Sequence, residues 1–434
     1  MAHFSFLSKK FQIYIGVLFI ITSIVVLSNP ITLHPDSYGY IEMYFNRTPV
    51  YPLFVGFVKA IFGNYFQPAL KVLQLGIGLY AIWFFILQLR KHISLQTLWY
   101  LILTAILIIP YVYNHRIANN VLTEAIAYPL YLLTTIHFII FFFKERTKHL
   151  VYGLVFLFIL LLTRKQFLYF VPIGIAILLW IGFKSKTFKR HIPYLITLVL
   201  LPFLVSLTDS TYHKIMHGHF TNTPWTGIHL LAPAMYVADK DDASIYTSEE
   251  EKIYFNTIFS EIEKNKYNKE AAVSNGEDII SHYISNFARI ANSTIYPIGK
   301  ELYEPDLSED DALIKIDKTT TAMALPLILD NFKAWSAVYI KNFIYGFENS
   351  KYVLLYIILF LFGLSKLNTQ KTNVYKAIAF VTCITLSNMA IVAIGMHTLK
   401  RFTFYNDWVL FFIIFILLNV ISKKYLSTNE SISI

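Results

Sequence analysis

Four short polar segments of the chain carry side chains that could do chemistry, and each segment adjoins an apolar run. In chain order they hold Asp36, Glu124, Arg164 with Lys165, and Lys400 with Arg401. A carboxylate can accept the proton of a hydroxyl group that attacks an electrophile. A guanidinium binds two phosphate oxygens at once. Ionisable groups at the edge of a bilayer are costly unless they face a cavity or one another, so we expect the four segments to form one site.

Further polar and aromatic residues lie in or close to the same segments. They are His34, Tyr40, Arg47, Tyr51, His115 and His397. The three histidines do not show the H-x-x-x-H or D-x-D spacing of a metal site. We therefore expect no cofactor, with a divalent metal ion left open as an alternative.

The composition determines which elements must carry these residues. Of 434 residues, 56% are hydrophobic and 15% charged, whereas a soluble domain has about 25% charged residues. A single soluble core cannot bury so much apolar side chain, because cores stop growing near ~250–300 residues. The formal net charge is +10, but the basic residues lie at the ends of apolar runs, as in membrane proteins. We expect a lipid bilayer and no nucleic acid as partners.

The apolar runs predict an all-α polytopic membrane protein with about ten transmembrane helices. A spanning helix needs about 20 mostly apolar residues. The predicted spans are 11–29, 70–89, 95–112, 123–143, 149–164, 166–183, 191–208, 350–366, 375–396 and 407–422.

The loop charges predict the orientation of these spans. With the N-terminus in the cytoplasm, the short loops on that side hold 16 of the 37 Lys and Arg residues, as the positive-inside rule requires. The long loop 209–333 holds 20 of the 27 Asp and Glu residues and is expected outside. Both termini are then cytoplasmic, and the four polar segments share the extracytoplasmic face. The residue usage favours a low-GC bacterium and its cytoplasmic membrane.

The long loop is expected to be largely helical. Residues 245–271 and 275–296 read as polar helices, and Ile253, Phe255, Ile258 and Phe259 are spaced to bury one face. Residues 323–347 could lie at the membrane surface or form an eleventh span; we favour the surface, because an added span would reverse every later loop. Three parts result: a transmembrane module 1–208, a loop domain 209–349 and a transmembrane module 350–434.

Three motifs resemble GT-C glycosyltransferases, a superfamily that includes the protein O-mannosyltransferases and the lipid A aminoarabinose transferases. HPDSYGYIEMYFNRTPVYPLFVGFVKAIFG is similar to the family's first outer loop, with Asp36, Tyr40 and the stretch 47–52 at the matching positions. NVLTEAIAYPL resembles the second acidic position, and Arg401-Phe402 the late Arg-aromatic element. Many relatives have a second acidic residue after the first, where this chain has Ser37. The WWDYG signature of oligosaccharyltransferases is absent.

The resemblance implies an inverting glycosyltransferase that moves a sugar from a polyprenyl-phosphate donor, undecaprenyl-linked in bacteria. The acceptor is a hydroxyl of an extracytoplasmic glycan, lipid or protein of the cell envelope. Asp36 is the expected catalytic base, with Glu124 orienting the acceptor or Asp36. The donor phosphate is assigned to Arg401, Lys400, Arg47, Arg164 and Lys165, and the sugars to Tyr40, His34, Tyr51, His115 and His397.

Two other classes of protein stay open. A Wzy-like polysaccharide polymerase or ligase also combines 10–12 spans with one large outer loop, but it tends to place arginines in that loop, where Arg289 is the one arginine of residues 209–333. A transporter or flippase of lipid-linked substrates is expected to bury charges or break helices at mid-membrane. Here the interiors of the predicted spans hold no Asp, Glu, Lys or Arg except Lys71, near one end.

Overall fold

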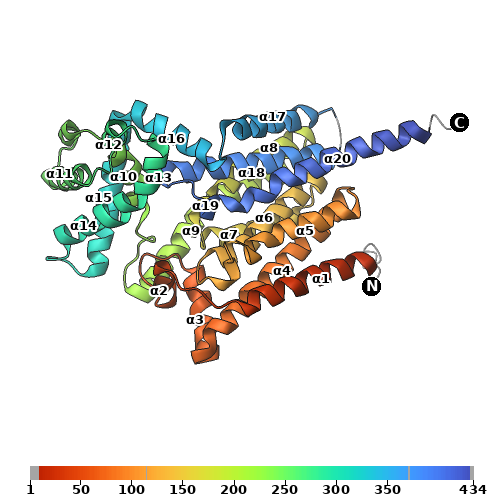
Figure 1. Cartoon of the computed structure of the whole chain (residues 1–434), viewed down its shortest axis with the longest axis horizontal. Helices are drawn as coiled ribbons and strands as arrows, with labels where there is room; N and C mark the ends of the chain where they lie inside the picture. The colour runs from red at the N-terminus through yellow and green to blue at the C-terminus, as the bar shows by residue number, and fades with distance from the viewer. Residues whose placement is uncertain (1–8, 114, 370–371, 431–434) are drawn as a thin grey trace. The chain divides into compact units, whose positions relative to one another are not determined.

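The computed structural model describes residues 9–113, 115–369 and 372–430, with side chains up to residue 422. The described residues form α-helices joined by short 3₁₀ and π-helical turns, and one isolated parallel bridge between Thr32 and Asn120 (Figure 1).

Eight helical stretches in the described part of the chain are long and apolar enough to cross a bilayer. They are Lys9–Ser28, Val50–His92, Thr97–Asn119, Glu124–Lys144, Lys165–Lys184, Phe188–His217, Asn373–Gly395 and Lys400–Ser422. Backbone groups in a bilayer must be satisfied within the protein, and helices do this inside one segment. The expected class, a helical membrane protein, is confirmed at this level.

When helix length and composition are the criteria, the described residues contain fewer candidate spans than the ten predicted. Two predicted spans coincide with helices at or below the lower limit of about 17 residues for a crossing: α7 (Thr147–Leu161) has 15 residues and α17 (Ser350–Lys366) has 17. Helix α16 (Phe332–Gly346) meets α17 at a bend of 81°, and the two together would make a ninth crossing. The count of ten stays a prediction.

The chain divides into two compact units. The first comprises residues 1–205, 356–385 and 404–434, and the second comprises residues 206–355 and 386–403. Residues 386–403, which the sequence grouped with the C-terminal spans, cluster with the second unit. Helices α9 (Phe188–His217), α17 and α18 (Asn373–Gly395) contribute residues to both units.

Helix α6 (Glu124–Lys144) is the central helix of the first unit. Every residue from Glu124 to Phe143 is buried, and α4 (Phe66–His92), α7 and α8 (Phe170–Lys184) pack against it. A helix that is apolar on all sides is one that must be covered on all sides. Its single carboxylate lies in the first turn, where the helix dipole favours negative charge. The best-buried helix of the unit thus positions Glu124.

The remaining helices of the first unit surround this centre. They are α1 (Lys9–Ser28), α2 (Pro35–Ile41), α3 (Val50–Phe62), α5 (Thr97–Val112) and α20 (Asp407–Glu430). Helix α1 packs against α4 and α5, and α20 packs against α5.

The second unit is built from shorter helices with one hydrophobic core, and its helices α10 to α15 are drawn green to cyan in Figure 1. They are α10 (Thr226–Val237), α11 (Glu249–Lys264), α12 (Lys269–Ser274), α13 (Ile279–Ile290), α14 (Tyr296–Tyr303), α15 (Glu309–Asp330) and α16, with the short α19 (Lys400–Thr403). A Cβ atom at Gly227 of α10 would lie 2.4 Å from the backbone oxygen of Asp317 in α15. The two helices therefore pack as closely as only glycine permits.

One detail of the expected helical pattern is wrong. Phe255, Ile258 and Phe259 of α11 are buried as predicted, but Ile253 is 55% exposed. Ile253 lies two residues before Phe255, a separation that turns a side chain to another face of a helix.

Candidate functional site

The site is assembled by contacts between loop segments far apart in the sequence. Thr32 N donates to Asn119 O at 2.8 Å, and the Asn119 side chain donates to the carbonyl of Val26 at 2.9 Å. These bonds fix the segment after α1 beside the segment that leads into α6. Asp36 and Glu124 follow these two segments within a few residues.

A second contact fixes the two arginine-bearing segments. Thr48 Oγ1 donates to Thr163 O at 2.9 Å, and Val50 N donates to Leu162 O at 3.4 Å. Arg47 directly precedes Thr48, and Arg164 directly follows Thr163. Each arginine is therefore one residue away from the same backbone contact.

The first charged pair of the site joins Asp36 and Arg47. Arg47 Nη2 lies 3.1 Å from Asp36 Oδ1, and the guanidinium carbon lies 4.7 Å from the ring centroid of Tyr40. Pro35 begins the short helix α2, and His34 N donates to Ser37 Oγ at 2.9 Å. The Asp36 side chain is 38% exposed, so this carboxylate can be reached by a ligand.

A glycine makes this pair possible. A Cβ atom at residue 39 would lie 2.6 Å from Arg47 Nε, closer than side-chain carbon atoms approach a nitrogen. Gly39 therefore gives the guanidinium the space it occupies beside Tyr40.

The second charged pair joins Glu124 and Arg164 and is buried. Arg164 Nη1 lies 2.9 Å from Glu124 Oε1, with side-chain exposures of 11% and 5%. The same nitrogen lies 3.4 Å from Thr123 Oγ1 and 3.4 Å from Tyr405 Oη. A buried ion pair needs such additional partners to offset its desolvation.

Tyr40 connects the two pairs. Burial raises the pKa of Tyr40; the charges of Arg47 and Arg164 oppose this rise, and those of Glu124 and Asp36 add to it. The phenol is thus within electrostatic reach of both carboxylates and both guanidiniums. It is a protonated hydrogen-bond donor at neutral pH.

The ring of Tyr51 packs against the ring of Tyr40. The two rings meet edge to face, with centroids 5.1 Å apart. Tyr51 is fully buried and its hydroxyl donates to Gln74 Oε1 at 2.7 Å. The Gln74 amide in turn donates to Ala118 O at 3.0 Å. Tyr51 therefore contributes to the framework of the site rather than to its surface.

The other predicted first-unit residues lie at the edge of this group. Lys165 is exposed at the start of a 3₁₀ turn after Arg164. The ring of His115 lies 4.6 Å from that of Phe404. His34 Nε2 and Arg47 Nε are buried and have no hydrogen-bond partner among the described residues.

Three predicted site residues belong to the second unit. Lys400 Nζ lies 3.8 Å from Glu348 Oε1, and the Arg401 guanidinium lies 5.8 Å from the Phe402 ring. His397 Nδ1 lies 3.0 Å from Ile284 O, and burial lowers the pKa of His397. The grouping of these three residues with the carboxylates stays a prediction.

Sequence reasoning missed three contributors. Gln74 is a single amide in an apolar run, and its polarity was the available signal. Tyr405 follows Arg401 by four residues, but it is uncharged and belongs to no motif that we recognised in the sequence. The contact of Thr48 with Thr163 spans 115 residues, and no local sequence pattern predicts it.

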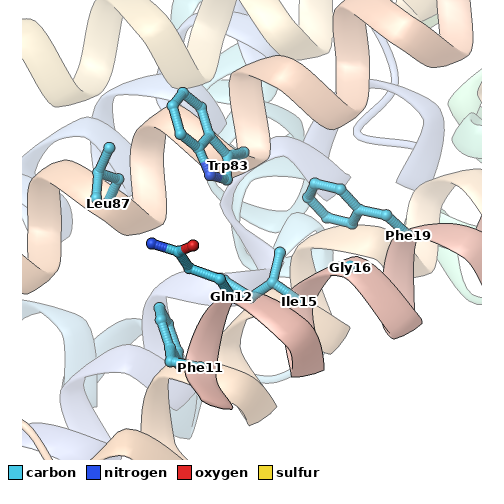
Figure 2. Close-up of a pocket in the computed structure, with 7 residues that line it drawn as sticks. All are labelled: Phe11, Gln12, Ile15, Gly16, Phe19, Trp83 and Leu87. Atoms are coloured by element: carbon cyan, nitrogen blue, oxygen red, sulfur yellow. The ribbon is translucent and has the colours of Figure 1, made fainter. Parts of the chain in front are cut away.

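The first unit also contains an apolar hollow of about 230 Å³ (Figure 2). Phe11, Ile15 and Phe19 of α1 face Trp83 and Leu87 of α4 across it, and the Gln12 amide points into it. The far end of α1, at Ser28, lies about 20 Å from Ile15 at 1.5 Å per helical residue, and Asp36 follows that end in the sequence. The hollow is therefore separate from the charged pairs.

The described residues contain no group of three or more His, Cys, Asp or Glu side chains arranged to hold a metal ion. Comparisons with known protein families, curated proteins and solved structures gave no match. Fold and site define a class: a helical membrane protein with two carboxylate–guanidinium pairs grouped around one tyrosine where its central helix begins.

Proposed function

We propose that this protein is an inverting glycosyltransferase that transfers a sugar from a polyprenyl-phosphate donor to a hydroxyl group. The observation that carries the proposal is the unequal exposure of two carboxylates in one cluster. Asp36 is accessible and Glu124 is buried, each beside a guanidinium. Such a cluster combines a base that an acceptor can reach with cations suited to a phosphate leaving group.

The reaction assigns a separate task to each group. The acceptor oxygen attacks the anomeric carbon, and the bond from that carbon to the phosphate oxygen breaks. Asp36 takes the proton of the acceptor hydroxyl. The lipid phosphate leaves with the bonding electron pair, so negative charge grows on its oxygens. Attack opposite the leaving group inverts the anomeric carbon in one step.

The cations stabilise the charge that develops on the leaving phosphate. Arg47 is the closest candidate, because it already lies beside Asp36 and its Nε has no partner among the described residues. Arg401 is proposed as a further phosphate ligand, with Lys400 and Lys165 as helpers. Arg164 is held by Glu124, so we assign Glu124 a positioning role.

We further propose a bacterial cytoplasmic membrane location with both termini in the cytoplasm. Helix α1 ends, α6 begins and α7 ends next to the charged pairs, and this supports a cluster on one side of the membrane. A single cysteine at position 275, exposed in the second unit, tests the orientation after Cys383 is replaced by Ser. Labelling by a membrane-impermeant thiol reagent in intact cells is expected. Labelling restricted to inverted vesicles would contradict it.

The activity is tested with full-length protein in nanodiscs and a synthetic polyprenyl-phosphate sugar labelled in the sugar. Envelope extract from the source cells supplies the acceptor. We expect label to move into the acceptor with release of polyprenyl phosphate. In reconstituted vesicles, movement of the intact donor across the bilayer without any sugar transfer would instead establish a flippase.

A further inference from the structure

The second unit contains a hollow of about 410 Å³ lined by three lysines. Lys269 comes from α12, and Lys333 and Lys341 come from α16. Asp330, at the end of α15, is the one acidic residue that lines it. The hollow therefore has an excess of two positive charges in a segment that is otherwise rich in acidic residues.

The ammonium groups of these three lysines differ from those of four other lysines in the unit, which lie in close ion pairs. Lys252, Lys264, Lys300 and Lys315 lie 2.7–3.2 Å from glutamate oxygens. The ammonium groups of Lys269, Lys333 and Lys341 make no ion pair or hydrogen bond with the residues that the structure describes. The nearest carboxylates act on them only at longer range, Asp278 on Lys341 and Glu270 on Lys269. Cations gathered in a concave surface focus a positive potential and attract anions.

The geometry of α16 indicates from which side an anion arrives. Phe332, Trp335 and Tyr339 stack along one side of the helix, with ring centroids 6.5 and 5.5 Å apart. Trp and Tyr side chains in such positions favour the membrane interface. Lys333 and Lys341 are each two positions from one of these rings, roughly 160° around a helix with 3.6 residues per turn. Lys333 and Lys341 thus lie on the side of α16 away from Trp335 and Tyr339, which favours a ligand from water over a lipid headgroup.

A second hollow, of about 510 Å³, is lined in part by a residue next in sequence to one that lines the first. Asp278 lines this hollow and the next residue, Ile279, lines the first. Tyr267 offers a ring here, with the Arg289 guanidinium 5.6 Å from its centroid. Asn275 and Ser285 add amide and hydroxyl groups to the lining. Planar polar side chains around an aromatic ring suit the hydroxyl groups and apolar faces of sugar rings.

We propose that the two hollows form one binding site for a water-soluble anionic glycan. Carboxylate or phosphate substituents bind the three lysines, and sugar rings lie along the second hollow against Tyr267. The site lies outside the carboxylate cluster, and binding to it does not require the sugar transfer proposed above. Its test contains no donor, so its failure and the failure of the transferase proposal are distinguishable.

The probe is an oligogalacturonate of defined length, compared with its uncharged methyl ester. Binding to full-length protein in neutral nanodiscs is measured by calorimetry. We expect the acid to bind at least tenfold more tightly than the ester, and this preference to shrink as salt screens the lysines. Equal affinity for both probes would overturn the proposal.

Lysine variants locate the binding. The triple change Lys269→Gln, Lys333→Gln and Lys341→Gln should weaken binding of the acid tenfold or more. The matched triple change Lys240→Gln, Lys264→Gln and Lys318→Gln removes the same charge from exposed positions outside both hollows and should weaken it less than twofold. Equal losses in the two triple variants would reduce the effect to net charge and overturn the proposal.

Two further variants and a lipid-binding measurement distinguish loss of the site from misfolding and from binding of a lipid headgroup. Ala337→Glu adds a negative charge to the first hollow at an exposed position and should also lower acid binding tenfold. Tyr267→Ala should weaken both the acid and the ester. If the lysine triple variant lost binding to anionic-lipid vesicles but kept glycan binding, the site would be a headgroup site and the proposal would be wrong.

Discussion

Arg164 Nη1 lies 2.9 Å from Glu124 Oε1 where α6 begins, and both side chains are almost fully buried. Glu124 thereby holds the guanidinium in a fixed place beside Tyr405 and Thr123. Asp36 and Arg47 are also paired, but this pair is reached by solvent. The buried pair is therefore tested by measurements of stability, and the exposed pair by measurements of turnover.

Removing either partner of the buried pair should destabilise the protein. Glu124→Gln or Arg164→Gln leaves an unpaired buried charge and should cost about 3–5 kcal/mol. The double variant should be more stable than the sum of the single losses predicts. Denaturant unfolding of the four proteins in one double-mutant cycle measures the coupling. Strictly additive losses would show that the two side chains do not act as a pair.

Asp36→Asn should lower turnover without lowering stability. The amide keeps the size of the side chain but cannot take a proton, and a general base contributes about 10²–10⁴-fold. Donor binding and the unfolding midpoint should stay unchanged. Glu42→Gln is the matched control, because Glu42 is an exposed carboxylate paired with Lys59 at 3.0 Å. Near-normal turnover in Asp36→Asn would remove Asp36 from the chemistry.

Gly39→Ala should impair activity through Arg47. The new methyl group would occupy the space of Arg47 Nε and push the guanidinium away from Asp36 and Tyr40. Misplacement by about 1 Å can reduce turnover roughly 10²-fold, while the loss of a partly exposed ion pair costs only about 0–1 kcal/mol. Gly16→Ala is the control, since a Cβ atom there meets nothing within 4 Å. Equal kinetics for both variants would exclude a role for this close packing.

Arg401→Ala should weaken donor binding. If Arg401 pairs with the donor phosphate, losing it leaves that charge unpaired and costs about 2–5 kcal/mol. A fluorescent polyprenyl-phosphate analogue measures the affinity, and Lys351→Ala supplies a control at an exposed basic residue of the same unit. Unchanged affinity would assign Arg401 to the membrane surface, where long basic side chains reach the headgroups.

Stability should fall as the pH drops below about 6.5, in part because of His397. Burial and the nearby charge of Arg401 lower the pKa of His397, while its bond to Ile284 O opposes this. The unfolded chain then binds a proton that the native protein resists, so acid favours unfolding. One such group changes stability by at most about 1.4 kcal/mol per pH unit. His397→Gln should reduce the slope between pH 5 and 6.5 relative to the unchanged protein. An identical slope would show that other groups determine it.

The helices could be predicted from the sequence, but the pairing of their charged side chains could not. Each of the eight stretches long enough to cross a bilayer overlaps a predicted span, because lipid and buried helices both demand continuous apolar residues. The loop charges predicted that Asp36 and Glu124 lie on the same side of the membrane, and this stays a prediction. Which arginine meets which carboxylate depends on the contact between Thr48 and Thr163, and local sequence does not encode a contact over 115 residues. Tyr40 was predicted as a sugar ligand, a role that its burial among four charges leaves untested.

Burial of α6 on all sides also constrains how the protein is made. Arg164 is synthesised 40 residues after Glu124, at the far end of α7. Until then α6 contacts lipid or the insertion machinery, and its apolar side chains are stable in either environment. Its first residue does not share that tolerance, because a carboxylate at the edge of a bilayer is costly until a cation neutralises its charge. The α6–α7 hairpin is thus the smallest nascent segment in which this charge is neutralised, and the two helices should enter the membrane together.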